Sequence, residues 1–106
     1  MFTFNQDVAV TNCEPGVTRK VLSYSEELMM CEVIFEKGAR GMLHSHDHLQ
    51  VSYVGKGSFE FTVGEKTKIV TKGDSVYIPS GVTHGVYALE DGILVDVFNP
   101  MRADFI

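Results

Sequence analysis

The sequence predicts an all-β protein, built as an antiparallel β-sandwich or β-barrel. Short runs of alternating apolar and polar residues follow one another along the chain, and turns that contain glycine separate them about every ten residues. No stretch has the apolar period that a long helix would require. A chain of 106 residues suits one domain with one hydrophobic core, and we expect residues 1–106 to form it without a linker or an internal repeat.

Alternation between apolar and polar residues defines the expected strands. In two of them the alternate positions are apolar and would share one face: Met29, Cys31, Val33 and Phe35 in the first, and Phe59, Phe61 and Val63 in the second. Gly64 and Glu65 are typical of a two-residue hairpin turn. The tail, 99–106, shows no clear period. We expect strands over residues 17–24, 28–36, the run that carries His44 and His46, 49–54, 58–63, 66–71, 76–79, 84–89 and 93–98.

The charge balance bears on the partners of the protein. Lys and Arg total 9 against 14 Asp and Glu, a net charge of -5, so no broad basic face can be assembled. We therefore expect no nucleic-acid partner and no membrane partner. A small anionic substrate stays open, because one buried arginine can outweigh the average charge of the chain. Hydrophobic residues make up 44% of the chain, which excludes a disordered protein.

The chain ends and the cysteines bear on location. The N-terminal residues lack the basic and apolar regions of a signal peptide, and no apolar run approaches the roughly 20 residues of a membrane helix. Cys13 and Cys31 have no metal-ligand spacing, and Cys31 lies in an apolar alternating segment, as a small buried residue would. We expect both thiols to be reduced and the protein to be cytoplasmic.

The histidines are the first sign of chemistry, because three of the 4 lie between positions 44 and 48. His44 and His46 stand two apart, so on a strand both rings would point to one face. Gln50 has the same parity if the strand continues, and a jelly roll would bring His84 alongside from a distant strand. Such a set offers three nitrogens and one amide oxygen to an ion, and imidazole suits Zn, Cu, Fe, Ni and Co. Taken alone, the histidine pair is as typical of a solvated loop as of a metal site.

The residues that frame the histidines form two spaced arrays. The first runs Gly38-x5-His44-x-His46-x3-Gln50-x6-Gly57, and the second runs Gly73-x5-Pro79-x-Gly81-x2-His84. Together, over 38–57 and 73–88, they resemble the two signature motifs of the cupin superfamily. This resemblance implies a single-domain cupin fold, an antiparallel jelly-roll β-barrel.

Two positions depart from the usual cupin pattern. Gln50 stands where the family usually has Glu, and Ala88 stands where an Asn often ends the second motif. A neutral Gln leaves the full charge of the ion uncompensated, which favours Lewis-acid chemistry over dioxygen chemistry. The motif skips His48, which we therefore expect in the loop beside the ligands.

The run at 93–98 is nearly all apolar, with Asp96 in its middle. One interpretation places Asp96 and Phe98 on a partly exposed face; the other points both side chains into the cavity of the histidines. In the second case the carboxyl group of Asp96 would have a tunable pKa suited to proton transfer. Arg102 would then reach back as a bidentate clamp for a substrate carboxylate, or else be a solvated residue of the tail.

The resemblance becomes closer along the whole chain. The segments 19–22, 44–50, 77–79 and 96–105 are similar to the small pectin-degradation cupins, the KdgF family, and 89–106 is the most distinguishing stretch. This implies an enzyme that converts 4,5-unsaturated monouronates, released by pectate or alginate lyases, into linear 5-keto-4-deoxyuronates. It also implies a metal held by His44, His46, Gln50 and His84, and catalysis by Asp96, Phe98 and Arg102, the last two also binding substrate.

Two other classes of function stay open. One is a metal-dependent sugar-binding or sensor cupin without chemistry, and the other is a different cupin isomerase or dioxygenase. The expected cofactor is a divalent transition metal: Ni, Zn, Fe, Co or Mn. The expected partners are a small anionic sugar and, because many short strands leave edges to cover, a second copy in a homodimer.

Overall fold

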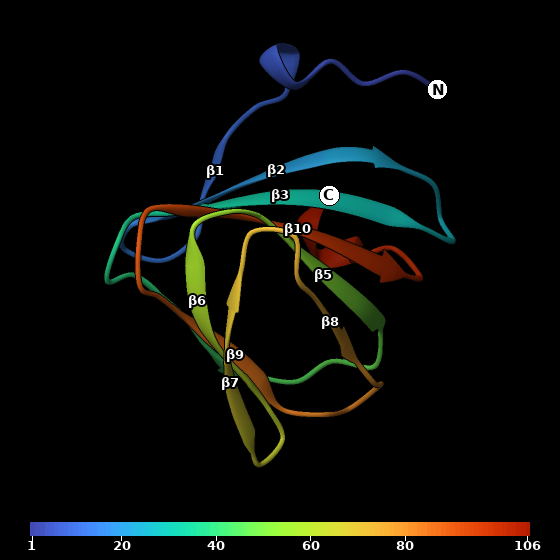
Figure 1. Ribbon diagram of the computed structural model, residues 1–106. Helices are drawn as coiled ribbons and strands as arrows, with labels where there is room; N and C mark the ends of the chain where they lie inside the picture. The colour runs from blue at the N-terminus through green and yellow to red at the C-terminus, as the bar shows by residue number, and fades with distance from the viewer.

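The computed structural model describes residues 1–106 and shows two antiparallel β-sheets joined by short turns (Figure 1). The only helical segments are two 3-10 turns, η1 (Asn5–Asp7) and η2 (Ala103–Phe105). Neither has the length or the apolar character that crossing a membrane requires. The strands are β1 (Thr11–Asn12), β2 (Val17–Tyr24), β3 (Met29–Phe35), β4 (Arg40–His44), β5 (Leu49–Lys56), β6 (Ser58–Val63), β7 (Lys66–Thr71), β8 (Ser75–Ile78), β9 (His84–Ala88) and β10 (Gly92–Asn99).

The strand order brings distant parts of the chain side by side. One sheet has the order β1-β2-β3-β10-β5-β8, and the other has the order β4-β9-β6-β7. The C-terminal strand β10 thus lies between β3 and β5, so residues near the end of the chain reach the middle of the larger sheet. The pairing leaves two sheets with free edges rather than one closed barrel, because β4 pairs only with β9 and β7 only with β6. The expectation of antiparallel β-structure is confirmed, whereas complete barrel closure is not found.

The predicted strands agree closely with the observed ones. Strands β2, β6 and β7 have the predicted bounds, and most others differ by a residue or two at their ends. The alternation of apolar and polar residues explains this agreement, because a strand with one buried face must repeat its apolar residues every second position. The two-residue strand β1 was not predicted, because it is too short to show a period.

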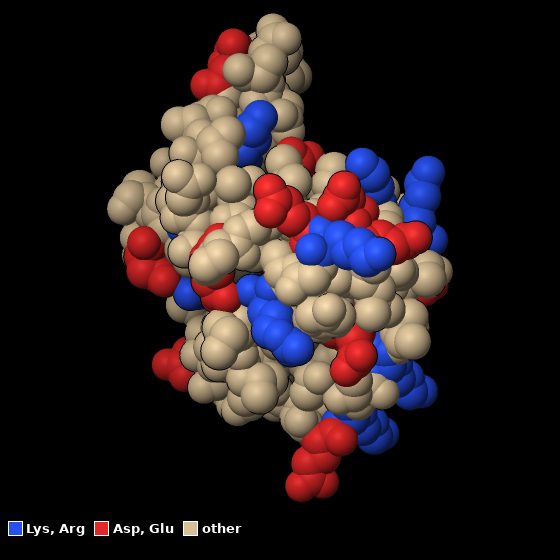
Figure 2. All heavy atoms as spheres, turned by 90° about the vertical axis from the view of Figure 1, so that its left-hand side faces the viewer, with Lys and Arg blue, Asp and Glu red and all other residues tan.

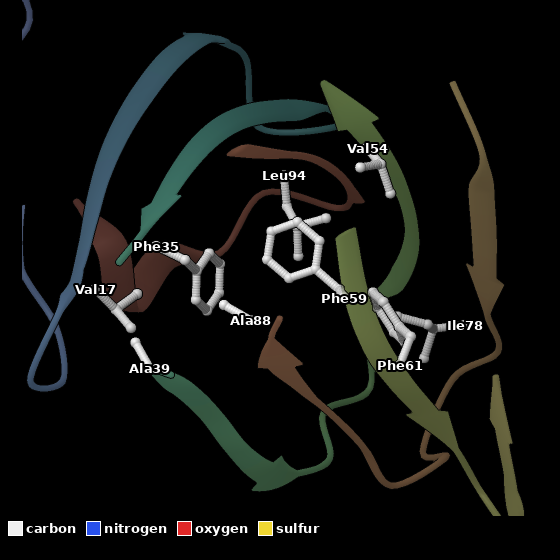
Figure 3. Packing of buried hydrophobic residues seen from close by; sticks show 9 residues of the cluster. All are labelled: Val17, Phe35, Ala39, Val54, Phe59, Phe61, Ile78, Ala88 and Leu94. Atoms are coloured by element: carbon white, nitrogen blue, oxygen red, sulfur yellow. The ribbon is translucent and has the colours of Figure 1, made fainter. Parts of the chain in front are cut away.

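The core lies between the two sheets (Figure 3). Phe35 from β3 meets Phe59 from β6 edge to face, with ring centroids 5.2 Å apart. As the alternation predicted, Met29, Cys31 and Phe35 of β3 are buried, as are the two phenylalanines of β6. The main cluster comprises Val17, Phe35, Ala39, Val54, Phe59, Phe61, Ile78, Ala88 and Leu94. A smaller cluster of Met29, Cys31 and Phe98 lies apart from it.

The outer surface carries charges of both signs. On the face shown in Figure 2, Lys and Arg side chains lie among Asp and Glu side chains and form no continuous patch of one sign. The N-terminal segment lies on the outside of the larger sheet, where Lys20 Nζ donates to the main-chain oxygen of Asn5 at 3.0 Å and to its side-chain oxygen at 2.7 Å. This polar attachment leaves Phe2 and Phe4 exposed.

We predict that Phe59→Ala lowers the free energy of unfolding by about 3–5 kcal/mol, because it opens a cavity between the two sheets. Ile69→Ala on β7 is the control, since Ile69 is 66% exposed and its truncation should change stability by less than about 0.5 kcal/mol. Urea unfolding followed by tyrosine fluorescence measures both. Equal losses for the two variants would contradict this description of the core.

Candidate metal centre

Three histidines converge where β4 and β9 pair. His44 is the last residue of β4, His46 lies two residues later in the following loop, and His84 is the first residue of β9. His44 and His84 face each other across the strand pair, with ring centroids 4.4 Å apart. The His46 ring lies 4.9 Å from that of His84, and one nitrogen from each ring falls within 4.8 Å of the others. These three side chains are positioned to bind a metal ion.

Glycines allow this close approach of the main chain. A Cβ atom on Gly85, the residue after His84, would lie 2.8 Å from the carbonyl oxygen of Gly41 on β4. The absence of a side chain therefore lets the two histidine-bearing strands pack tightly. Gly81, with a φ of 77°, donates its N–H to the carbonyl oxygen of His46 at 2.8 Å, which ties the loop before β9 to the histidine loop.

The main chain also fixes how the three rings present their nitrogens. Each Nδ1 atom hydrogen-bonds a carbonyl oxygen two residues away in the chain: His44 to Met42 at 2.8 Å, His46 to His48 at 3.0 Å, and His84 to Val82 at 2.9 Å. A carbonyl only accepts, so each Nδ1 carries the proton and each Nε2 of a neutral ring keeps its lone pair. Burial lowers the pKa of His46, and it lowers the pKa of His84 to about 4. Near neutral pH these two rings are therefore in the neutral form that ligates metals.

The site contains acceptor atoms that lack a hydrogen-bond donor, as a cation-binding site would. Nε2 of His84 is buried and has no hydrogen-bond partner. Nε2 of His46 lies 2.9 Å from Oε1 of Gln50, so two acceptor atoms face each other when the ring is neutral. The amide group cannot simply be turned over, because its Nε2 donates to Ser52 Oγ at 3.0 Å. Three imidazole nitrogens and one amide oxygen are a donor set that suits a divalent transition ion.

A hydrogen-bonded chain links this site to Asp96. Ser52 accepts from Gln50 and donates its own hydroxyl proton to Oδ1 of Asp96 at 2.6 Å. Ser52 is 1% exposed, so these partners satisfy it in place of water. The sequence interpretation did not single out Ser52. Its position two residues after Gln50, on the same face of β5, was the available signal.

The route by which Gln50 reaches the site differs from the prediction. The strand does not continue from His44 to Gln50: β4 ends at His44, residues 45–48 turn, and β5 belongs to the other sheet. The argument from a shared strand face is therefore wrong for His46 and Gln50. The turn lets the chain cross from one sheet to the other, so the histidines and the glutamine approach from opposite sides. His48 stands outside the group of three, with its ring 5.5 Å from that of His46.

Asp96 and Phe98 point inward. On β10 the buried residues Leu94 and Phe98 alternate with the half-buried Val95 and Val97, and Asp96 shares the inner face. The interpretation that placed Asp96 and Phe98 on an exposed face is therefore wrong. Burial raises the pKa of Asp96 to about 6, although the hydrogen bonds from Ser52 and Gln50 act in the opposite direction.

Arg102 is not a solvated tail residue. Its side chain is 13% exposed and lies over two aromatic rings, 5.3 Å from the centroid of Phe98 and 4.3 Å from that of Phe105. Its Nε and one terminal nitrogen donate to the two carboxylate oxygens of Asp104, at 3.1 and 2.9 Å. These hydrogen bonds lower the pKa of Asp104. The bidentate geometry expected of Arg102 is present, but a carboxylate of the chain itself occupies it.

One cavity of about 270 Å³ opens onto these groups. Its volume lies just below the roughly 300–1,000 Å³ typical of ligand pockets, which suits one small molecule. It lies between the two hydrophobic clusters, with Phe35 and Leu94 on one side and Phe98 on the other. The polar lining includes His44, Gln50, Ser52, His84, Asp96 and Arg102. Such a cavity can hold a small polar ligand against histidine nitrogens, a buried carboxyl group and a guanidinium.

Known proteins resemble this chain in sequence. The family model described as "Cupin domain" matches residues 31–98. The pectin degradation protein KdgF of Dickeya dadantii (strain 3937) is 44% identical over 93 residues, which cover 86% of this chain and 84% of that protein.

Solved structures agree with the sequence comparison. The crystal structure of an RmlC-like cupin from Shewanella frigidimarina NCIMB 400 superposes with a TM-score of 0.96 and 40% identity, over 99% of this chain and 95% of that one. The structure of KdgF from a Halomonas species gives a TM-score of 0.95 and 34% identity, over 100% and 98% of the two chains. The chain therefore belongs to the cupin family and, within it, to the KdgF pectin degradation proteins.

Proposed function

We propose that this protein is a metal-dependent enzyme that converts 4,5-unsaturated monouronates into linear 5-keto-4-deoxyuronates. The observation that carries the proposal is that two histidines of the three-histidine cluster, a carboxyl group and a guanidinium line one small cavity. The similarity to KdgF over most of the chain supports it. The substrate would come from lyase digestion of pectin or alginate, because both yield unsaturated uronates that are nearly equivalent at C4 and C5.

The reaction opens a cyclic enol ether. A proton adds to C4, water adds to C5, and the resulting hemiketal breaks its bond between C5 and the ring oxygen to leave a ketone at C5. The metal would be held by His44, His46, Gln50 and His84, and it would supply Lewis-acid charge to the sugar oxygens. Because Gln50 is neutral, the ligand set leaves the ionic charge available for this purpose.

The remaining side chains would handle the proton and the sugar ring. Asp96 would deliver the proton to C4, and its pKa of about 6 makes both protonation states accessible near neutral pH. The ring of Phe98, 5.7 Å from that of His46, would pack against the sugar and exclude water. Arg102 would place its positive charge beside the uronate carboxylate.

The direct test mixes the metal-loaded protein with unsaturated galacturonate and follows the loss of ultraviolet absorbance of the conjugated enol ether. The proposal predicts a loss faster than in buffer, and faster than with chelator-treated protein. Sugar binding without acceleration would instead indicate a binding or sensor cupin. Oxygen consumption on a diketone or thiol would indicate a dioxygenase.

Asp96→Asn tests the proton transfer. The amide oxygen can still accept from Ser52, but the side chain carries no exchangeable acid proton, so kcat should fall by about 10²–10⁴-fold with unchanged metal content. Glu65→Gln, in the exposed hairpin turn between β6 and β7, is the matched control and should keep full activity. Full turnover by Asp96→Asn with metal bound would remove Asp96 from this role.

Two substitutions test the metal ligands and their support. His84→Ala should abolish stoichiometric binding of Ni²⁺ or Zn²⁺ in calorimetric titration. Ser52→Ala frees the amide of Gln50 to rotate, so metal affinity should fall by about 10–100-fold. Ser58→Ala, whose hydroxyl donates to Glu90 far from the site, should bind as the wild type does. Wild-type affinity in Ser52→Ala would contradict the role of the hydrogen-bonded chain.

We further propose a homodimer formed through the outer face of the larger sheet. The register aligns Met30, Val97, Val51 and Tyr77 in one row across β3, β10, β5 and β8. Three of these are 41–58% exposed, which makes an apolar strip that a second copy would cover. Val51→Glu should then yield a monomer in light scattering, while Ile69→Glu on β7 leaves the dimer intact. A wild-type monomer at micromolar concentration would contradict the proposal.

A further inference from the structure

We propose that Arg19 is a second carboxylate-binding residue of the cavity and selects acidic over neutral sugars. This inference rests on the proposed function in one respect, namely that the ligand is a sugar acid. The clamp predicted from the sequence was Arg102 alone. Three observations on the two arginines point to Arg19 as well.

The first observation is its place in the fold. Arg19 lies on β2, opposite Val33 of β3, and its side chain lines the same cavity as Arg102 and Asp96. The two arginines reach the cavity from parts of the chain that are far apart in sequence. They meet at Phe105: the guanidinium carbon of Arg19 lies 3.5 Å from the ring centroid, and that of Arg102 lies 4.3 Å from it.

The second observation is that Arg19 has no polar partner. Its Nε atom is buried without a hydrogen-bond acceptor, and the only ion pair of the structure joins Arg102 to Asp104. The residue as a whole is half-buried, and a buried N–H donor without an acceptor is unfavourable. Stacking on Phe105 offsets part of this cost and holds the side chain in place. An anion in the cavity would supply the missing acceptor.

The third observation is the contrast between the two guanidinium groups. Arg102 already donates two of its five N–H groups to Asp104, whose carboxylate also compensates its charge. Arg19 makes no hydrogen bond that competes for its donors. A uronate carboxylate therefore meets a guanidinium without a hydrogen-bond partner at Arg19 and one that it shares with Asp104 at Arg102. Two positive charges held against one ring also repel each other, and a bound carboxylate between them relieves that repulsion.

The test compares Arg19→Met with Lys20→Met. Methionine keeps an apolar stem against Phe105 and removes the donors, whereas Lys20 is the neighbouring cation that hydrogen-bonds Asn5 outside the cavity. Both substitutions remove one positive charge, so a general effect of net charge would be equal in the two. Arg19→Lys is the third variant, which keeps the charge but not the planar fork.

Two readouts are measured on the metal-loaded proteins: KM and kcat for unsaturated galacturonate, and calorimetric Kd for galacturonate and galactose, which do not react. In Arg19→Met we expect KM and the Kd of galacturonate to rise about 10–100-fold, as for the loss of a charge-assisted hydrogen bond. We expect kcat to change by no more than a few fold, and the preference for galacturonate over galactose to fall by the same factor as the affinity for galacturonate. Lys20→Met should match the wild type, and Arg19→Lys should fall between.

The outcomes separate this inference from the proposed function. If the wild type binds galacturonate without turning over the unsaturated sugar, and Arg19→Met loses that binding, the proposed reaction fails and the role of Arg19 stands. If the wild type turns over its substrate and Arg19→Met has the same KM and Kd as Lys20→Met, the role of Arg19 is overturned. Wild-type protein that neither binds galacturonate nor reacts overturns both. Circular dichroism and thermal unfolding show whether each variant is folded. If Arg19→Met is unfolded, the KM and Kd of Arg19→Lys test the role of Arg19 in its place.

Discussion

Three Nδ1–carbonyl hydrogen bonds are the interaction on which the site depends. They turn the Nε2 lone pairs of His44, His46 and His84 toward one another, an arrangement that is unfavourable in the absence of a cation. The close packing of β4 and β9 at Gly85 and the hydrogen bond from Gly81 to the histidine loop both serve to hold it. The main chain therefore sets the orientation of the three imidazole rings.

The two sheets contribute different kinds of group to the cavity. The smaller sheet and its loop bring histidine nitrogens, whereas the larger sheet brings Gln50, Asp96 and Arg19. The aromatic core between the sheets sets their separation (Figure 3), so it also sets the distance between the ligand nitrogens and the proton-carrying carboxyl group. Substitutions deep in the core would therefore be expected to alter chemistry as well as stability.

The sequence predicts features that depend on the local alternation of apolar and polar residues. It does not predict contacts that form only when the two sheets come together. Strand β6 has its predicted bounds because apolar alternation is a property of the strand itself. The three histidines were found from motif spacing, although strand parity does not explain how Gln50 joins them. The role of Ser52 can be inferred only once the inner face of β5 is known. The role of Arg19 can be inferred only from its contact with Phe105 in the C-terminal turn, which joins residues more than eighty positions apart.

Cys31 lies directly across the β3–β10 pair from Asp96, completely buried, and its thiol has a pKa raised to about 12, mainly by burial. A protonated thiol is a poor ligand and a poor nucleophile, since metals and oxidants both react with the thiolate. The thiol of Cys31, buried behind Asp96, therefore does not compete with the histidine nitrogens for an ion. The same burial that packs Cys31 against Met29 and Phe98 keeps its thiol protonated and shields it from oxidation.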